Sequence, residues 1–168
     1  MAFDRTAINK GKCMQDFGLC DLKGVYQHTT RLRSKGFLVV AFLNASDSGS
    51  DAVAKTLAEW TSVSDKITVV AVAVGEREDA ESLIARTEVK YTVLWDFEAY
   101  TASLWSVNAA PAVFIMNGQG LVLGRVLGSD AAELESARAL LSEEVAKADA
   151  AAKAAAEAKA AADAAAKK

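Results

Sequence analysis

The side chains best suited to redox or metal chemistry are few in this chain. Cys13 and Cys20 are its two cysteines, and His28 is its one histidine. Two thiols are too few for a disulfide framework, and this set of ligands is too small for a zinc site or a multi-histidine centre. We therefore expect neither a metal nor a cofactor. A thiol reaction would have to use Cys13, Cys20 or a cysteine of a partner.

The separation of the two cysteines argues against a disulfide between them. If residues 14–22 are extended, the cysteines lie up to ~23 Å apart at ~3.3 Å per residue. A disulfide requires Cα atoms within ~7 Å. The alternating pattern before Cys20 also turns Phe17 and Leu19 inward and Cys20 outward. We expect two free thiols.

A polar run, Ser46-Asp47-Ser48-Gly49-Ser50-Asp51, stands at the predicted start of a helix. The helix is indicated by an apolar stripe at i, i+4 and i+7: Val53, Leu57 and Trp60. Ser48 and Asp51 could supply a side-chain oxygen to a free backbone N–H and a negative charge to the positive helix end. Alternatively, Asp47 and Ser48 form a polar site for a small anion or a substrate backbone, although Asp47 and Asp51 would repel an anion.

The remaining pattern alternates between strands and helices. Apolar runs over residues 37–43 and 67–74 predict two buried parallel strands, and residues 16–29 predict an N-terminal hairpin. Further strands are expected at 91–94, 112–116 and 121–127, the last two joined by the turn Asn117-Gly118-Gln119-Gly120. Two further helices are predicted by residues that recur every three or four positions. These residues are Ala80, Leu83, Ile84 and Thr87 for the first helix, and Phe97, Tyr100, Leu104 and Val107 for the second. The prediction is an α/β fold with a mixed sheet covered on both faces.

Six further residues could be considered functional, but a structural role explains each of them. Trp60, Trp95 and Trp105 fit core or core-edge positions rather than a base-stacking platform. Three acidic residues have no visible partner and are interpreted as helix-start or solvated loop charges: Glu76, Glu78 and Asp96.

The C-terminal segment differs in composition from the rest. We divide the chain into a domain over residues 1–146 and an Ala/Lys-rich extension over 147–168. Asp130 and Glu133 form a capping-box pattern, and no Gly or Pro follows Asp130, so one continuous helix is expected to the end. An alanine seam with 3, 4 spacing favours contact with a partner protein or a second copy: Ala148, Ala151, Ala155, Ala158, Ala162 and Ala165. The alternative is a solvated spacer helix.

Charge and hydropathy narrow the classes of partner. The formal net charge is −3, with +2 on residues 147–168 and −5 on the remainder. Nothing in this balance favours nucleic acid or a membrane surface. No apolar run approaches the roughly 20 residues of a membrane span, and residues 1–5 lack the apolar core of a secretion signal. We expect a cytoplasmic location and no direct membrane insertion.

The order of these elements and several local motifs resemble one family. These motifs are Asp16-Phe17-x-Leu19-x-Asp21-Leu22-x-Gly24, the strand over 37–45, Trp95-Asp96, Ala109-Ala110-Pro111-Ala112-Val113-Phe114-Ile115 and the turn over 117–120. Over residues 11–145 the chain resembles the thioredoxin-like superfamily, in its alkyl-hydroperoxide-reductase/thiol-specific-antioxidant (redoxin) branch. The resemblance implies a thioredoxin-like fold and a cis peptide bond before Pro111. It also implies a groove beside Ala110 and Pro111 that pairs with an extended peptide, unless the proline serves the fold alone.

The departures from the family concern its chemistry. The two positions of the family's Cys-x-x-Cys motif are Ser48 and Asp51, and the position of its buried proton-relay carboxylate is Phe42. No cysteine lies between residues 21 and 168, so the peroxidatic cysteine of the branch is also missing. A hydroxyl cannot replace a thiolate in disulfide exchange.

Three functions remain open from sequence. The first is a redox-inactive module that binds or scaffolds other proteins, with no catalytic residues. The second is a thiol oxidoreductase or peroxidase that uses Cys13, Cys20 or a partner cysteine. The third is a structural subunit held in a larger assembly by its C-terminal helix.

Overall fold

The computed structural model describes residues 10–166, and within them the main sheet has five strands in the order β5-β4-β3-β6-β7. These are β3 (Phe37–Leu43), β4 (Ile67–Val74), β5 (Thr92–Asp96), β6 (Ala112–Asn117) and β7 (Val122–Leu127). Strands β3, β4 and β5 are parallel, whereas β6 and β7 are antiparallel to their neighbours. The predicted mixed sheet, its parallel central pair and its closing hairpin are confirmed.

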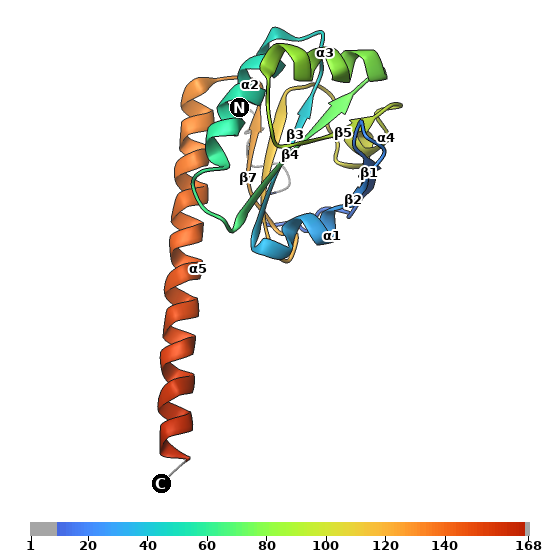
Figure 1. The fold of residues 1–168 in the computed structure, drawn as a ribbon. Helices are drawn as coiled ribbons and strands as arrows, with labels where there is room; N and C mark the ends of the chain where they lie inside the picture. Colours follow the sequence, from blue (N-terminus) through green and yellow to red (C-terminus); the bar gives the residue numbers. More distant parts are fainter. Residues whose placement is uncertain (1–9, 167–168) are drawn as a thin grey trace.

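Helices cover both faces of this sheet (Figure 1). They are α1 (Thr29–Leu32), the 3-10 turn η2 (Arg33–Lys35), α2 (Ser48–Trp60), α3 (Arg77–Thr87), α4 (Tyr100–Leu104) and α5 (Ala131–Ala165). Alternate residues of β3 face opposite sides because a strand has a period of two. Val39, Ala41 and Leu43 pack with α2, α3 and α5. Leu38, Val40 and Phe42 pack with α1 and α4.

The N-terminal hairpin consists of β1 (Gly18–Cys20) and β2 (Tyr26–His28), as the alternating pattern predicts. The segment before it crosses one face of the sheet. It begins beside β7, where Cys13 bridges Leu121, and the chain reaches β5 at the turn of the hairpin, where Asp21 bridges Leu94. Along this path Phe17 is buried against Trp105, with ring centroids 5.4 Å apart.

The helix predicted around residues 97–107 is shorter than its apolar spacing suggests. Two of the four residues that carry this spacing, Phe97 and Tyr100, are 51% and 68% exposed. Thr101, Ala102 and Trp105 are buried instead. Asp96 decides this arrangement, because its carboxylate accepts hydrogen bonds from the backbone N–H groups of Thr101 and Ala102 and so fixes the start of α4.

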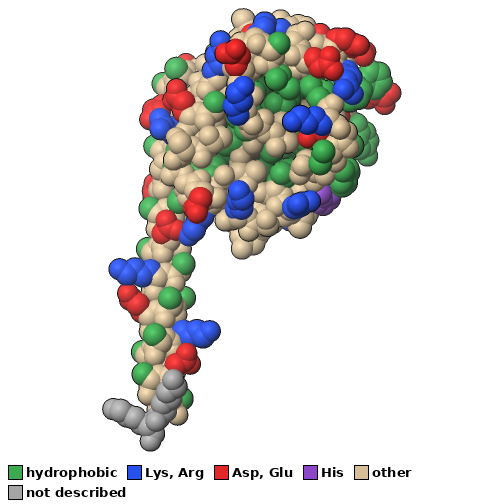
Figure 2. Space-filling model, in the orientation of Figure 1, with side chains coloured by type: hydrophobic (Ala, Val, Ile, Leu, Met, Phe, Trp, Pro, Cys, Tyr) green, Lys and Arg blue, Asp and Glu red, His purple; other side chains and the backbone are tan. Residues whose placement is uncertain are grey.

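Helix α5 begins at the predicted Asp130, whose side chain accepts a hydrogen bond from the N–H of Glu133 at 2.9 Å. Its buried residues are Leu134, Ala137, Leu141 and Val145. Residues 149–166 are exposed, and this part of the helix extends away from the body (Figure 1). In Figure 2 its Lys, Asp and Glu side chains project from a surface of small residues. The predicted continuous helix is therefore confirmed as far as Ala165.

Candidate functional site

The candidate site begins where β3 ends and α2 starts. Asp47 is the N-cap of α2, and its side chain accepts a hydrogen bond from the N–H of Gly49 at 2.9 Å. The cap expected at Ser48 is wrong, because the cap is Asp47 and the exposed Ser48 is the first residue of α2. The structural serine is Ser50, which is fully buried and accepts a hydrogen bond from the N–H of Asn44 at 2.9 Å. Ser50 therefore closes the loop between β3 and α2, a role that its sequence context did not reveal.

Asp51 is bound in an ion pair with α3. Its Oδ2 and Oδ1 atoms accept hydrogen bonds from Nε and Nη2 of Arg86, each at 2.9 Å. Nη2 of Arg86 also donates to the carbonyl of Ala45 at 2.8 Å. The hydrogen bonds from Arg86 lower the pKa of Asp51, so the carboxylate stays ionised well below neutral pH. In this arrangement Asp51 positions α2 against α3 and has no proton to exchange near neutral pH.

The proline of the predicted site lies at the same end of the sheet. The Ala110–Pro111 peptide bond is cis, as the family resemblance implies. The carbonyl of Pro111 accepts a hydrogen bond from Gly128 at 2.8 Å, and Ala112 pairs with Phe42 near the end of β3. Residues 47–51 and 110–111 are thus positioned by neighbouring strands, whereas Cys13 and Cys20 belong to other parts of the fold.

A serine after β7 was not singled out from the sequence. A Cβ placed on Gly49 would lie 2.9 Å from Oγ of Ser129, so this side chain approaches the first turn of α2 closely. Ser129 follows a Gly and precedes a helix cap, a pattern that reveals nothing of the contact with residue 49.

Phe42 occupies the position that resemblance assigns to a buried carboxylate. Its side chain is fully buried. Its ring lies 5.5 Å from that of Trp105 and 5.9 Å from that of Phe114, measured between centroids. An aromatic cluster of this kind contributes packing and cannot transfer protons.

The two cysteines are free and exposed. Cys13 lies beside β7, and Cys20 lies in β1, next to the residue that bridges β5. Since β7 and β5 are the two outer strands of the sheet, four strand spacings of about 4.8 Å place the cysteines roughly 19 Å apart across it. The expectation of two unpaired thiols is confirmed, and an intrachain disulfide is excluded by geometry.

The remaining candidates have structural roles. Trp60 and Trp105 are buried, and Trp95 is half-buried with its Nε1 donating to the carbonyl of Gly75. Glu76 precedes α3 and Glu78 lies in its first turn. Within residues 10–166, no three His, Cys, Asp or Glu side chains gather as a metal site requires. No helix in the same range has the length and apolar character needed to cross a bilayer.

No protein family model matches the chain, and no curated protein matches its sequence. Solved structures do match it. One described as a thiol:disulfide interchange protein DsbE, from Chlorobium tepidum, is 21% identical with a TM-score of 0.70, and the match covers 79% of this chain and 94% of that one. Peroxidoxin BcpB from Mycobacterium tuberculosis is 18% identical with a TM-score of 0.67, with 82% and 97% covered. A secreted disulfide oxidoreductase from Mycobacterium tuberculosis is 16% identical with a TM-score of 0.64, with 76% and 95% covered.

At sequence identities this low, the matches show a likeness of the backbone fold and nothing about function. The matches extend over nearly the whole length of the neighbours, so they concern the fold as a whole rather than one local motif. The chain has the thioredoxin-like fold, which it shares with solved structures described as disulfide oxidoreductases and a peroxidoxin.

Proposed function

We propose that this chain is a redox-inactive thioredoxin-like module that binds or scaffolds other polypeptides. The observation that carries the proposal is the pairing of Asp51 with Arg86. At the position that the family resemblance gives to the second catalytic cysteine, this chain has a carboxylate that holds two helices together. Neither that carboxylate nor the exposed hydroxyl of Ser48 can form the S–S intermediate of thiol–disulfide exchange.

The polypeptide-binding part of the proposal rests on the end of the sheet beside Pro111. Ala110 is partly exposed there, and Ser48 is exposed at the start of α2. An extended segment could pair with the backbone next to Ala110, while Asp47 and Ser48 supply polar contacts. Phe42, which pairs with Ala112 next to Pro111, belongs to a buried aromatic cluster that contains no acid or base.

The exposed part of α5 is proposed as the assembly element. From Ala148 to Ala165 its alanine seam allows close approach of another helix, either from a second copy or from a partner. Methyl groups bury little area, so the seam alone should support only a weak pair. This feature also suits the structural-subunit alternative. Deleting residues 150–168 tests it by light-scattering mass and by recovery of partners, and an unchanged result in both removes the assembly role.

An activity assay with a built-in positive control tests the redox-inactive proposal. The full chain should reduce insulin and consume peroxide at the rate of the uncatalysed background. The double variant Ser48→Cys/Asp51→Cys places two thiols one helical turn apart at a helix N-terminus, where thiolates are stabilised, and should exceed that background. Turnover by the unmodified chain that disappears in Cys13→Ser or Cys20→Ser would refute the proposal.

The second candidate is a thiol oxidoreductase, favoured by the exposure of both thiols and by the names of the neighbours. The thiolate of Cys20 or Cys13 would attack a partner disulfide, forming a mixed disulfide and releasing one partner thiolate. Because the two cysteines are at opposite sheet edges, neither can resolve that bond for the other. Net reduction of the partner would require a small-molecule thiol to attack the chain's sulfur, which releases the partner as a dithiol, and a second such thiol to regenerate the cysteine and leave as the oxidised small-molecule disulfide. Mass spectrometry of the diamide-oxidised chain should then show disulfides only between chains.

A further inference from the structure

The outer edge of β7 is already paired with another segment at one end. The N–H of Gly11 donates to the carbonyl of Val122 at 2.8 Å, and the N–H of Val122 donates to the carbonyl of Lys12 at 2.9 Å. Cys13 bridges Leu121 in the antiparallel sense. Beyond this point, within residues 10–166, no backbone hydrogen bond joins residues 123–127 to any segment other than β6. An edge of this kind can pair with a further extended chain.

Arg125 lies in this open part of β7 and is 7% exposed. It stands opposite Phe114 on β6, and its Cζ atom lies 5.0 Å above the centre of that ring. Its Nε and Nη1 atoms are buried without a hydrogen-bond partner among the described residues. Burial lowers the pKa of Arg125. The contact with the aromatic ring offsets only part of the free energy that the guanidinium loses when it is removed from water. An anionic hydrogen-bond acceptor beside Arg125 would offset more of it.

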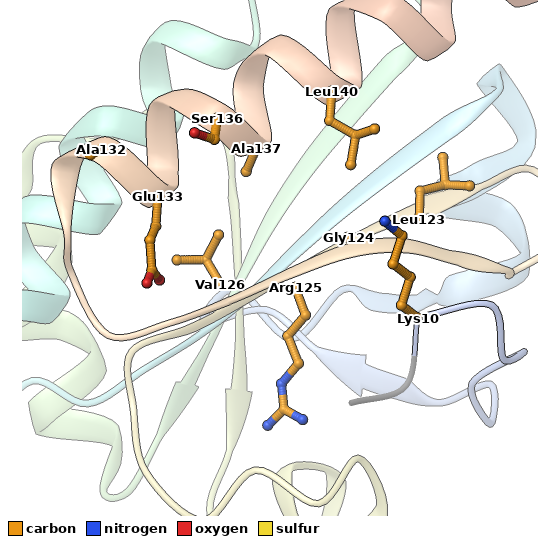
Figure 3. A pocket seen from close by; sticks show the side chains of 10 residues that line it. All are labelled: Lys10, Leu123, Gly124, Arg125, Val126, Ala132, Glu133, Ser136, Ala137 and Leu140. Atoms are coloured by element: carbon orange, nitrogen blue, oxygen red, sulfur yellow. The ribbon is translucent and has the colours of Figure 1, made fainter. Parts of the chain in front are cut away.

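The other face of the same strand borders an apolar pocket beneath α5, with a volume of about 440 Å³. Leu123, Val126, Ala137 and Leu140 form much of its wall, and Lys10, Glu133 and Ser136 add polar side chains at its border. Gly124 leaves the space open, since a Cβ there would lie 2.9 Å from Cδ2 of Leu140. Figure 3 shows Glu133 on the α5 side of β7 and the Arg125 side chain on the opposite side. The two faces of this edge therefore favour different side chains, one apolar and one acidic.

We propose that the edge of β7 beyond Val122 binds an extended polypeptide segment of alternating apolar and acidic residues, added antiparallel to the strand. Successive side chains of a strand point to opposite faces. A carboxylate of the segment would accept hydrogen bonds from Arg125, and the flanking apolar side chains would enter the pocket beneath α5. This site lies along the outer edge of β7 and uses none of residues 47–51 or 110–111. The proposal does not depend on whether the chain has redox activity.

The test uses the full chain and a fluorescein-labelled peptide, acetyl-Val-Glu-Val-Glu-Val-Glu-Val-amide, followed by anisotropy. A matched peptide with Gln in place of Glu should bind about tenfold more weakly, which is the usual effect of losing one charge-assisted hydrogen bond. In Arg125→Met the two peptides should bind equally. Arg31→Met removes the same charge from an exposed position on α1 and should keep the tenfold difference.

Tryptophan fluorescence gives a second measure of peptide binding. Trp105 and Arg125 contact the same ring, since the Trp105 and Phe114 centroids are 5.0 Å apart, so binding of the Glu peptide should change tryptophan emission. Equal affinity for both peptides in the unmodified chain, no binding at millimolar peptide, or a tenfold preference that survives Arg125→Met would each overturn the proposal. The first two outcomes require no variant, so they stand even if Arg125→Met folds poorly.

Discussion

Arg86 on α3 donates one hydrogen bond to each carboxylate oxygen of Asp51 on α2, both at 2.9 Å. The two residues are 35 positions apart in the chain, and their side chains are partly solvent-exposed. The pair joins α2 and α3, two of the three helices that cover one face of the sheet. Its consequence is a pH-dependent contribution to stability.

Asp51→Asn should lower Tm at pH 7, and the difference from the unmodified chain should shrink as the pH falls below about 4. The pKa of Asp51 is lowered in the folded state, so its contribution is present above the ordinary carboxylate pKa of about 3.9 and is lost as pH falls through the folded value. Thermal unfolding at pH 7 and pH 3 measures this. Asp65→Asn, at an exposed position without an ion pair in the described structure, serves as the control, and an equal effect of both variants would contradict the prediction.

Ser50→Ala should destabilise the chain by about 1–3 kcal/mol, because it leaves the Asn44 N–H without its acceptor. Ser48→Ala, two residues earlier and exposed, should change the free energy of unfolding by less than about 0.5 kcal/mol. Urea titration of the two variants compares them directly. A larger effect at Ser48 would restore it as the structural serine of this turn.

Phe42→Ala should lower the free energy of unfolding by about 3–5 kcal/mol, as expected when an aromatic ring is removed from a filled core. Phe42 is fully buried and contacts two other rings. Phe97→Ala makes the same chemical change at a side chain that is 51% exposed, and its cost should be far smaller. Denaturant unfolding followed by tryptophan fluorescence measures both, and similar costs would show that the cluster around Phe42 is loosely packed.

Removal of residues 150–168 should leave the midpoint of thermal unfolding unchanged while reducing the helical signal in circular dichroism. The described residues from 150 onward are all exposed, and their helix needs little tertiary support. The last contacts with the body lie just before them, at the half-buried Ala148 and in the ion pair of Asp149 with Lys66. A lower midpoint after truncation would indicate contacts that the described structure does not contain.

Local patterns were sufficient for the strands of the main sheet and for the long helices, but they did not predict α1 or η2. Continuous apolar runs predicted β3 and β4, the Asn117–Gly120 turn predicted the closing hairpin, and the absence of Gly and Pro after Asp130 predicted one long helix. In each case the information lies within a few neighbouring residues. The division of the chain near residue 146 stays a prediction, since α5 runs through that point without a break.

The sequence by itself could not determine which distant residues meet. The apolar spacing from Phe97 to Val107 predicts a helix there, but the helix spans only Tyr100–Leu104, its first turn is held by the carboxylate of Asp96, and the rings of Phe97 and Tyr100 are exposed. The partner of Asp51 depends on how α2 and α3 pack. The burial of Arg125 depends on β7 lying outside β6 with a register shift at Ile115 and Met116. Helix and strand periods are local properties, whereas these pairings follow from strand order and helix packing, which only the tertiary structure decides.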